Sequence, residues 1–564
     1  MFGSSDRGRT VSLNNNAVVK AGLSCLFLVS VIILVWKIPY GWGAYDEPFY
    51  IATPYRFIIS NDTFIADEWN MAQLSSLLLL IPVKIYSLLF PDMEGVIISF
   101  RMLYTLIHIL IALLLMRLLK NEGMAGVLSG LSYMLFVPFN IMNFSYDAIG
   151  LDCITLLIYA VYSCENPGKI RLTTIGILFA CAVLCNPYLV IIFIIYFIGA
   201  LTASIKKTEK RYVNIKDFLF VFMGILFPAA GFLTVLLMRT TVFAVLENLP
   251  YMLKDPTHGG ISITDKLYTA IGQISGIYFP WIYLWGILLL FQIFDKNRSK
   301  RKKVYMILSV AVFAGSTAGF ITNVRVNCYM LPLALLGMNM YALLDKKNRH
   351  TLYLWFTGLI YGIFMLMASD QGIYVVSMAM LISDIAAILI IRDVYNENRG
   401  GFLKYLILMI VLIQLMMEAV GLSRSTHWES ERIEKLDTVY EHGPLKGLRT
   451  TADKVDTYNR LIEDIDEYRG NGEKRIAFMM LNTWEYLYAG RPYGTFSSWL
   501  GYTDDFIAEK FLMWCRLHPD SLPEDVYFSK LEESCWKEEN VRKIASELGY
   551  EASEDDTGIR LFKR

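Results

Sequence analysis

Hydrophobic runs close to 20 residues long recur along the chain up to about residue 422, and each is long enough to cross a bilayer core as an α-helix. The first run covers about 17–36. Later runs lie near 71–90, 95–116, 124–142, 148–163, 172–185, 188–204, 217–238, 270–294, 304–321, 328–344, 351–368, 372–391 and 402–421. No A-x-A-like cleavage site follows the first run, so we expect a retained helix and not a signal peptide. The pattern predicts an α-helical polytopic membrane protein, with a multi-pass transmembrane domain over 1–422.

The run at 71–90 is ambiguous, because it contains several polar residues and a proline. If this run lies flat at the outer surface, the inner loops carry roughly 21 Lys and Arg residues and the outer loops between helices carry roughly 4. If it spans, this bias reverses while the basic N-terminus stays inside. The positive-inside rule therefore favours an interfacial or shallow re-entrant helix at 71–90. It predicts about 13 transmembrane helices, a cytoplasmic N-terminus and an extracytoplasmic C-terminus.

From about Ser423 the long hydrophobic runs give way to short alternating elements. The stretch 452–469 has an apolar stripe at helical spacing, and 537–548 is a second helix candidate. The strand candidates are RIAFMM at 475–480, DVYFS at 525–529 and a final GIRLFKR. Strands that alternate with helices predict a small extracytoplasmic α/β domain over 423–564. This tail contains no dinucleotide-binding, P-loop or nucleophile-elbow motif.

Composition agrees with a membrane protein. Of the 564 residues, 55% are hydrophobic, the formal net charge is zero, and the mean hydropathy is +0.43. The chain has no basic excess, so nothing suggests a nucleic-acid partner. The eight cysteines show no metal-binding spacing, and no two histidines have ligand spacing. A disulfide between Cys515 and Cys535 in the tail stays open.

Two adjacent carboxylates, Asp46 and Glu47 in GWGAYDEPFY, come only a few residues after the first run. Charge is costly so close to a bilayer and by default marks a functional site. One carboxylate could act as a general base, while the other holds a metal, orients an acceptor or stabilises a developing oxocarbenium ion. The alternative is a solvated loop over 38–70 with an interfacial aromatic belt that includes Tyr45 and Tyr50. We favour chemistry at Asp46 and treat 38–70 as a catalytic outer loop.

Five further residues have both a functional and a structural interpretation. Asp147 in NFSYDAIGLD is either a site residue or a helix N-cap. Arg101 either contacts a phosphate, for which a planar guanidinium is well suited, or snorkels from its helix to the surface. Arg56 and Arg325 are weaker candidates for the same phosphate contact. His258 is either an acceptor contact or a turn residue.

The order of these features resembles the GT-C class of integral membrane glycosyltransferases, and most closely the protein O-mannosyltransferase and aminoarabinose-transferase-like branch. A first helix is followed by YDEPFY, then by a flat amphipathic stretch, and then by the arginine of SFRMLYTLI near the start of the next helix. The likeness covers roughly 1–205. It departs from the family at 67–69, where Asp-Glu-Trp stands in a place that often holds a basic residue.

The resemblance implies a sugar donor that is linked to a polyprenyl phosphate or pyrophosphate and used at the outer face of the membrane. It assigns the acceptor base to Asp46, the partner of that base to Glu47, a donor-phosphate contact to Arg101 and an outer-turn carboxylate to Asp147. A divalent cation stays open as a cofactor, with Asp46, Glu47 and Asp147 as its ligands.

We therefore expect an inverting glycosyltransferase of the plasma membrane that moves a sugar from a polyprenyl-phosphate donor to a glycan, lipid or protein acceptor. Tyr45, Tyr50 and His258 are the residues expected beside the acceptor. Two other functions stay open. One is a transporter or flippase of lipid-linked sugars, although the sequence shows no clear internal repeat. The other is a non-catalytic envelope assembly or sensor protein.

Overall fold

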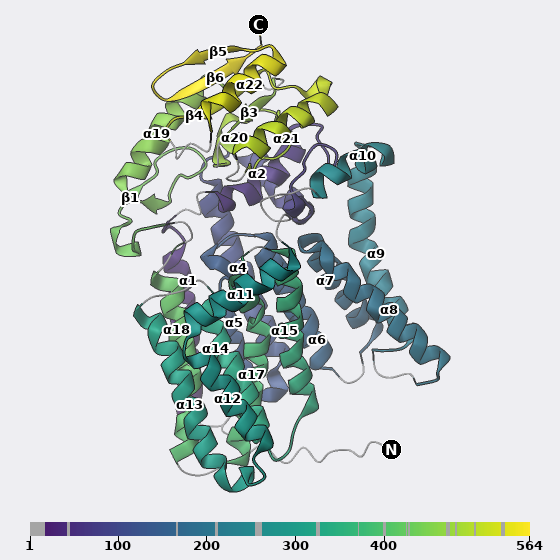
Figure 1. Cartoon of the computed structure of the whole chain (residues 1–564), viewed down its shortest axis with the longest axis vertical. Coiled ribbons are helices and arrows are strands. Elements are labelled where there is room, and N and C mark those ends of the chain that lie inside the picture. Colours follow the sequence, from purple (N-terminus) through teal and green to yellow (C-terminus); the bar gives the residue numbers. More distant parts are fainter. Residues whose placement is uncertain are drawn as a thin grey trace.

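The computed structural model describes most of the chain. The described residues are 17–41, 45–164, 167–208, 212–253, 262–322, 327–369, 371–398, 402–424, 426, 429–469, 474–479, 482–500, 504–531 and 536–563. The protein is elongated, with a long helical part and a smaller α/β part stacked on one end (Figure 1).

The helical part contains every hydrophobic run that the sequence predicts. Its helices are α1 (Ala17–Lys37), α2 (Asp46–Ile59), α3 (Leu80–Leu89), α4 (Val96–Leu118), α5 (Met124–Leu135), α6 (Tyr146–Tyr162), α7 (Lys169–Cys185), α8 (Val190–Ile205), α9 (Ile215–Leu237), α10 (Val242–Leu253), α11 (Ile263–Tyr278), α12 (Trp281–Phe294), α13 (Arg298–Thr322), α14 (Leu331–Leu343), α15 (Arg349–Ala368), α16 (Ile373–Ala379), α17 (Leu381–Glu397) and α18 (Phe402–Arg424). In Figure 1, α7, α8 and α9 form a flank beside the main bundle.

Fewer helices than predicted have the length and composition of a membrane span. Six such helices lie in the described ranges, or up to eight if α11 with α12 and α16 with α17 each make one bent span. The prediction of about 13 spans is therefore not confirmed. The physical reason is that several hydrophobic runs fall in helices too short to cross a bilayer straight, such as α5 with 12 residues and α14 with 13.

The ambiguous run at 71–90 forms a 3₁₀ stretch, η2 (Met71–Leu79), that continues into α3. One of its polar residues, Gln73, faces the preceding loop. Gln73 is fully buried, its Nε2 donates to the carbonyl of Glu68 at 2.5 Å, and its Oε1 accepts from the backbone N–H of Ile65 at 2.7 Å. The segment Met71–Leu89 is also long and apolar enough to span, so its interfacial position stays a prediction.

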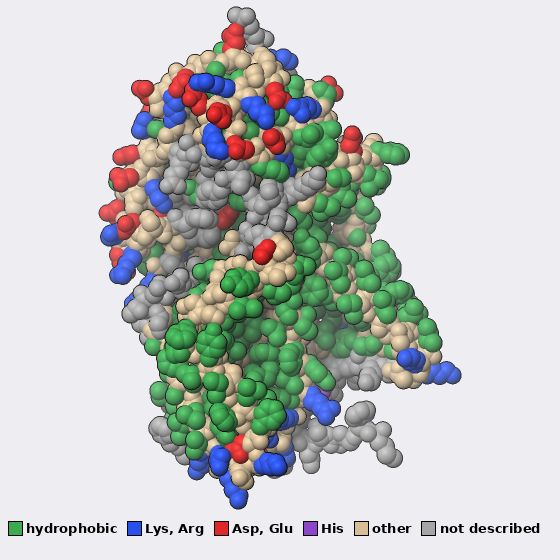
Figure 2. Space-filling model, viewed as in Figure 1, with side chains coloured by type: hydrophobic (Ala, Val, Ile, Leu, Met, Phe, Trp, Pro, Cys, Tyr) green, Lys and Arg blue, Asp and Glu red, His purple; other side chains and the backbone are tan. Residues whose placement is uncertain are grey.

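The surface of the helical part is apolar. Figure 2 shows a broad band of hydrophobic side chains between two charged ends, with acidic and basic groups over the α/β part and mainly basic groups at the opposite end. A band of this kind suits contact with lipid. The sidedness of the chain in a membrane stays a prediction.

The tail forms the α/β architecture that the sequence predicts. The strands β3 (Ile476–Phe478), β4 (Asp525–Ser529), β5 (Glu551–Glu554) and β6 (Gly558–Phe562) make one sheet in the order β3-β4-β6-β5, in which β3 and β4 are parallel and the other pairs are antiparallel. Its helices are α19 (Ala452–Asp466), α20 (Trp484–Ala489), α21 (Asp504–Leu517) and α22 (Glu538–Leu548). A short ribbon, β1 (Thr438–Val439) with β2 (Arg449–Thr450), precedes them. Cys515 is buried on α21, and Cys535 lies outside the described residues.

The tail packs directly against the first loop. The backbone N–H of Trp69 donates to the carbonyl of Phe496 at 2.7 Å, and the hydroxyl of Tyr493 donates to the carbonyl of Ala52 at 2.9 Å. One apolar core runs from the helical part into the tail. The loop 38–70 and the tail therefore lie on the same face of the helical bundle, and α2, which is part of that loop, lies between the tail and the bundle (Figure 1).

Candidate functional site

The predicted carboxylate pair begins a helix and does not lie in an open loop. Asp46 and Glu47 form the first turn of α2, where negative side chains interact favourably with the helix dipole. Pro48 follows in the same turn, where a missing N–H breaks no helical hydrogen bond. Asp46 is half-buried and Glu47 is buried. Tyr45 occupies the N-cap position and is half-buried.

Glu47 forms a bidentate ion pair with Arg101 of α4. The Nε and Nη2 of Arg101 each donate to one carboxylate oxygen of Glu47 at 2.6 Å. Its Nη1 donates to the backbone carbonyls of Ile38 at 2.8 Å and Tyr40 at 3.1 Å. The Arg101 side chain is 6% exposed, so it does not snorkel to the surface. Its guanidinium instead joins α4, the end of α1 and the first turn of α2.

A small cavity of about 10 Å³ adjoins this pair and also touches Lys37, the last residue of α1. It has room for about one water molecule. Lys37 is 1% exposed, and its Nζ donates to the carbonyl of Leu422 at 2.5 Å. The sequence analysis missed Lys37, although a lysine directly after a long apolar run was a signal. Two basic side chains, Lys37 and Arg101, and the carboxylate of Glu47 therefore share this cavity.

Tyr50 lies one α2 turn beyond the carboxylate pair. It is buried, and its ring meets Tyr146 of α6 edge-on at 6.0 Å between centroids. Burial raises the pKa of Tyr50, and the charges of Asp46, Asp147 and Glu47 raise it further. The ring contact joins α2 to the first turn of α6, the turn that carries Asp147.

Asp147 is not the N-cap of its helix. The N-cap of α6 is Ser145, whose side-chain oxygen accepts from the backbone N–H of Ala148 at 3.0 Å. Asp147 lies in the first turn and is 7% exposed. Asp147 therefore does not cap α6, and its role as a site residue stays a prediction.

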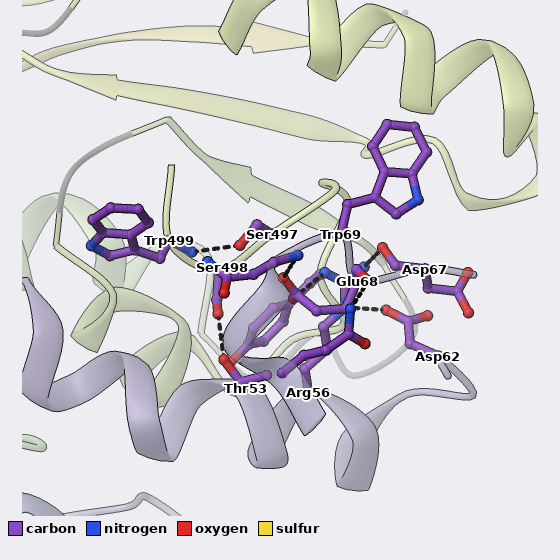
Figure 3. A network of polar contacts seen from close by, with 12 residues as sticks. Thr53, Arg56, Asp62, Asp67, Glu68, Trp69, Ser497, Ser498 and Trp499 are labelled. Carbon is purple, nitrogen blue, oxygen red and sulfur yellow. Dashed lines mark hydrogen bonds and ion pairs between the residues drawn. The ribbon is translucent and has the colours of Figure 1, made fainter. Parts of the chain in front are cut away.

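Arg56 does not face an external ligand, which corrects its assignment as a donor-phosphate contact. Its side chain is fully buried, with Nε donating to Asp62 at 2.7 Å and Nη1 to Glu68 at 2.9 Å. Its Nη2 donates to the carbonyl of Asp67 at 3.0 Å. Arg475 of the tail reaches the second oxygen of Asp62 at 2.7 Å. Figure 3 shows this network between α2, the loop that follows it and the tail segment at 497–499.

Glu68 binds Arg56 through its carboxylate, whereas Asp67 binds it through its backbone carbonyl and uses its carboxylate to accept from the N–H of Thr63. Burial raises the pKa of Glu68 and, together with the charge of Asp62, that of Asp67. Burial also disfavours the charged form of Asp62, but Arg56 and Arg475 outweigh it and lower the pKa of Asp62 below its ordinary value. Asp62 is therefore the charged centre of the network.

Two predicted site residues, His258 and Arg325, lie outside the described residues. Among the described residues, no group of three or more His, Cys, Asp or Glu side chains is placed to hold a metal ion, so Asp46, Glu47 and Asp147 do not form a three-ligand set.

Fold and site together define a polytopic helical protein whose first loop gathers carboxylates beneath an α/β domain. No family model and no curated protein sequence matches the chain. A search of solved structures matches ArnT from Cupriavidus metallidurans bound to undecaprenyl phosphate, at 10% identity over 96% of this chain and 98% of that chain, with a TM-score of 0.46.

Two archaeal structures from Archaeoglobus fulgidus also match. One is an oligosaccharyltransferase tethered to an acceptor peptide, at 11% identity over 90% of this chain and 69% of that chain, with a TM-score of 0.44. The other is the oligosaccharyltransferase AglB in complex with an inhibitory peptide and a dolichol-phosphate, at 10% identity over 91% and 70%, with a TM-score of 0.38.

Proposed function

We propose that this protein is a membrane glycosyltransferase that takes a sugar from a polyprenyl-phosphate donor, with Asp46 as the acceptor base. The observation that carries the proposal is the buried pair of Glu47 and Arg101 in the first turn of α2, next to Asp46. One turn further on, the contact between the rings of Tyr50 and Tyr146 joins α2 to the first turn of α6, which carries Asp147. Charged groups buried at such a position are costly, and such costs are typical of functional sites.

In the proposed reaction, a hydroxyl or amine of the acceptor attacks the anomeric carbon of the donor sugar. Asp46 takes the acceptor proton while the bond from the anomeric carbon to the phosphate oxygen breaks, and the polyprenyl phosphate leaves with the electron pair. Attack from the face opposite the leaving group inverts the anomeric centre. Asp147 adds negative charge near a developing oxocarbenium ion. Glu47 does not contact the acceptor in this scheme, because Arg101 occupies both of its oxygens.

Lys37 and Arg101 are the groups we assign to the donor phosphate. Both line the shared cavity together with Glu47, so they offer N–H donors to a phosphate that enters it. That cavity holds about one water molecule, so a phosphate enters only if the Glu47–Arg101 pair opens or shifts. The acceptor side is framed by the tail, whose Ser498 hydroxyl lies 3.1 Å from that of Thr53 on α2.

The test uses membranes that contain the full chain and a polyprenyl-phosphate monosaccharide labelled in the sugar. Wild type is expected to move the label into water-soluble, protein or new lipid products, and Asp46→Asn is expected to leave it on the donor. Full transfer by Asp46→Asn would overturn the assignment. Movement of intact labelled donor between leaflets without transfer would instead support a flippase.

A further inference from the structure

A second cavity lies at the far end of α2 from the carboxylates. It has a volume of about 340 Å³. Its wall includes Ile58 and Ile59 at the end of α2, Ser60 and Asn61 just after that helix, and the arginines Arg239 and Arg475. The 14 residues of α2 extend for about 20 Å at 1.5 Å per residue. The cavity is therefore separate from the site at Asp46, and the proposed reaction does not use it.

Arg239 presents much of its guanidinium to this cavity. The residue follows the end of α9 by two positions and is exposed. Its Nη1 donates to the carbonyls of Phe57 at 2.5 Å and Asp62 at 3.1 Å, which fixes the head group against the loop. No described residue accepts a hydrogen bond from its Nε or Nη2. Those N–H groups have the planar geometry that suits two phosphate oxygens.

Arg475 adds a second basic group to the wall of the cavity. Its Nη2 is paired with Asp62 and its Nη1 donates to the carbonyl of Tyr493 at 2.5 Å, while the side chain is 18% exposed. Asp62 is 1% exposed and also binds Arg56, so its charge is compensated inside the protein. The described residues that line the cavity include two arginines and no acidic residue.

An apolar surface leads up to the cavity along α9. This helix has 23 residues and the composition of a membrane span. Near its end, Leu233, Leu237 and Met238 are 51%, 52% and 80% exposed. Ile58 and Ile59 continue the apolar surface into the cavity wall. A lipid standing beside α9 would lay its chains on these residues and bring its head group to the two arginines.

We propose that this cavity binds the phosphate head group of an anionic lipid in the leaflet that faces the tail. A volume of about 340 Å³ accommodates a glycerophosphate-sized group. The paired arginines supply the charge, and the apolar approach along α9 selects a lipid over a free anion. This lipid site does not depend on a catalytic role of Asp46, because the cavity shares no residue with the site at Asp46.

The test measures lipid binding to the purified, delipidated full chain by native mass spectrometry in detergent. Phosphatidylglycerol is expected to bind more tightly than phosphatidylcholine. Arg239→Gln should weaken phosphatidylglycerol binding by about tenfold or more, the size expected for loss of charged hydrogen bonds. Arg460→Gln, which removes an exposed arginine from α19, is the matched control and should bind as wild type does.

A second variant keeps the test decisive if Arg239→Gln fails to fold. Asn61→Trp places a bulky ring at the exposed rim of the cavity without removing an arginine, and it should also weaken phosphatidylglycerol binding. Equal binding of phosphatidylglycerol by wild type and a folded variant would overturn the site. Full displacement of the lipid by millimolar inorganic phosphate would overturn the lipid as its ligand.

Discussion

Arg101 and Glu47, 54 positions apart in the chain, meet in a buried pair in which two nitrogens of the guanidinium each bind one carboxylate oxygen at 2.6 Å. This pair fixes the first turn of α2 against α4, and so it also fixes the backbone that carries Asp46. Glu47 is therefore a positioning residue in our account. A residue with that role should affect both stability and turnover.

Glu47→Gln should destabilise the protein by about 3–5 kcal/mol, because it leaves the Arg101 guanidinium buried with its charge uncompensated. Thermal unfolding in detergent measures the loss. The control is the exposed pair of Lys446 and Glu94, whose side chains are 51% and 43% exposed. Glu94→Gln should cost at most about 1 kcal/mol. Equal losses for the two variants would contradict the role given to the buried pair.

The Arg56 network predicts a specific dependence of stability on pH. The pKa of Asp62 lies below its ordinary value of 3.8, so its stabilising charge is fully present above that pH and is lost as the pH falls further. Wild type should melt well above Asp62→Asn at neutral pH, and the gap should shrink below about pH 4. Melting temperatures of both proteins across that range measure it. A gap that stays constant down to about pH 2 would count against the network.

The close crossing of α7 and α9 predicts opposite effects for two glycine substitutions. A Cβ on Gly176 would lie 2.0 Å from the carbonyl oxygen of Val221 and 3.0 Å from the Cα of Gly224, so Gly176→Ala must push the helices apart. We expect a loss of about 1–3 kcal/mol or more. Gly231 on α9 has open space around the same position, and Gly231→Ala should be neutral or stabilising by about 0.5–1 kcal/mol. Thermal unfolding of the two variants measures both effects. A smaller loss of stability for Gly176→Ala than for Gly231→Ala would contradict the close contact of α7 with α9.

Tyr493 links the tail to α2, and its removal should loosen that contact. Its hydroxyl bonds to the carbonyl of Ala52, its ring stacks on Tyr486 at 4.1 Å, and it is fully buried. Tyr493→Phe should cost about 1 kcal/mol, and Tyr493→Ala about 3–5 kcal/mol. Limited proteolysis should release the tail faster from the alanine variant than from the phenylalanine variant. Identical cleavage rates would show that the tail is held elsewhere.

Local pattern was enough to predict most elements. The helix α19 and the buried strand β4 were predicted at nearly their observed bounds. Their hydrophobic patterns depend only on residues that are close together in the sequence. The strand β5 was missed, since Glu551–Glu554 is exposed at a sheet edge and carries no apolar alternation. The prediction of about 13 spans is not confirmed, because several hydrophobic runs form helices shorter than a straight membrane span.

Asp46 and Asp147 were selected as site residues by residue type and by the side of the membrane expected for them, and their role stays a prediction. The ion pairs around them were not predicted. The pairing of Glu47 with Arg101 depends on how α2 packs on α4, and nothing in the sequence fixes that contact. The pairing of Arg56 could have been predicted from the sequence, because its partners Asp62 and Glu68 follow it by 6 and 12 positions in the same loop.

The most direct test of the central claim compares the turnover of Asp46→Asn with that of Asp456→Asn, which removes an exposed carboxylate from α19. The assay follows transfer of a labelled sugar from a polyprenyl-phosphate monosaccharide, and melting temperatures are recorded in parallel. Our account predicts that Asp46→Asn loses about 10²- to 10⁴-fold in rate with a nearly unchanged melting temperature, while Asp456→Asn stays active. Wild-type turnover by a folded Asp46→Asn protein would contradict it.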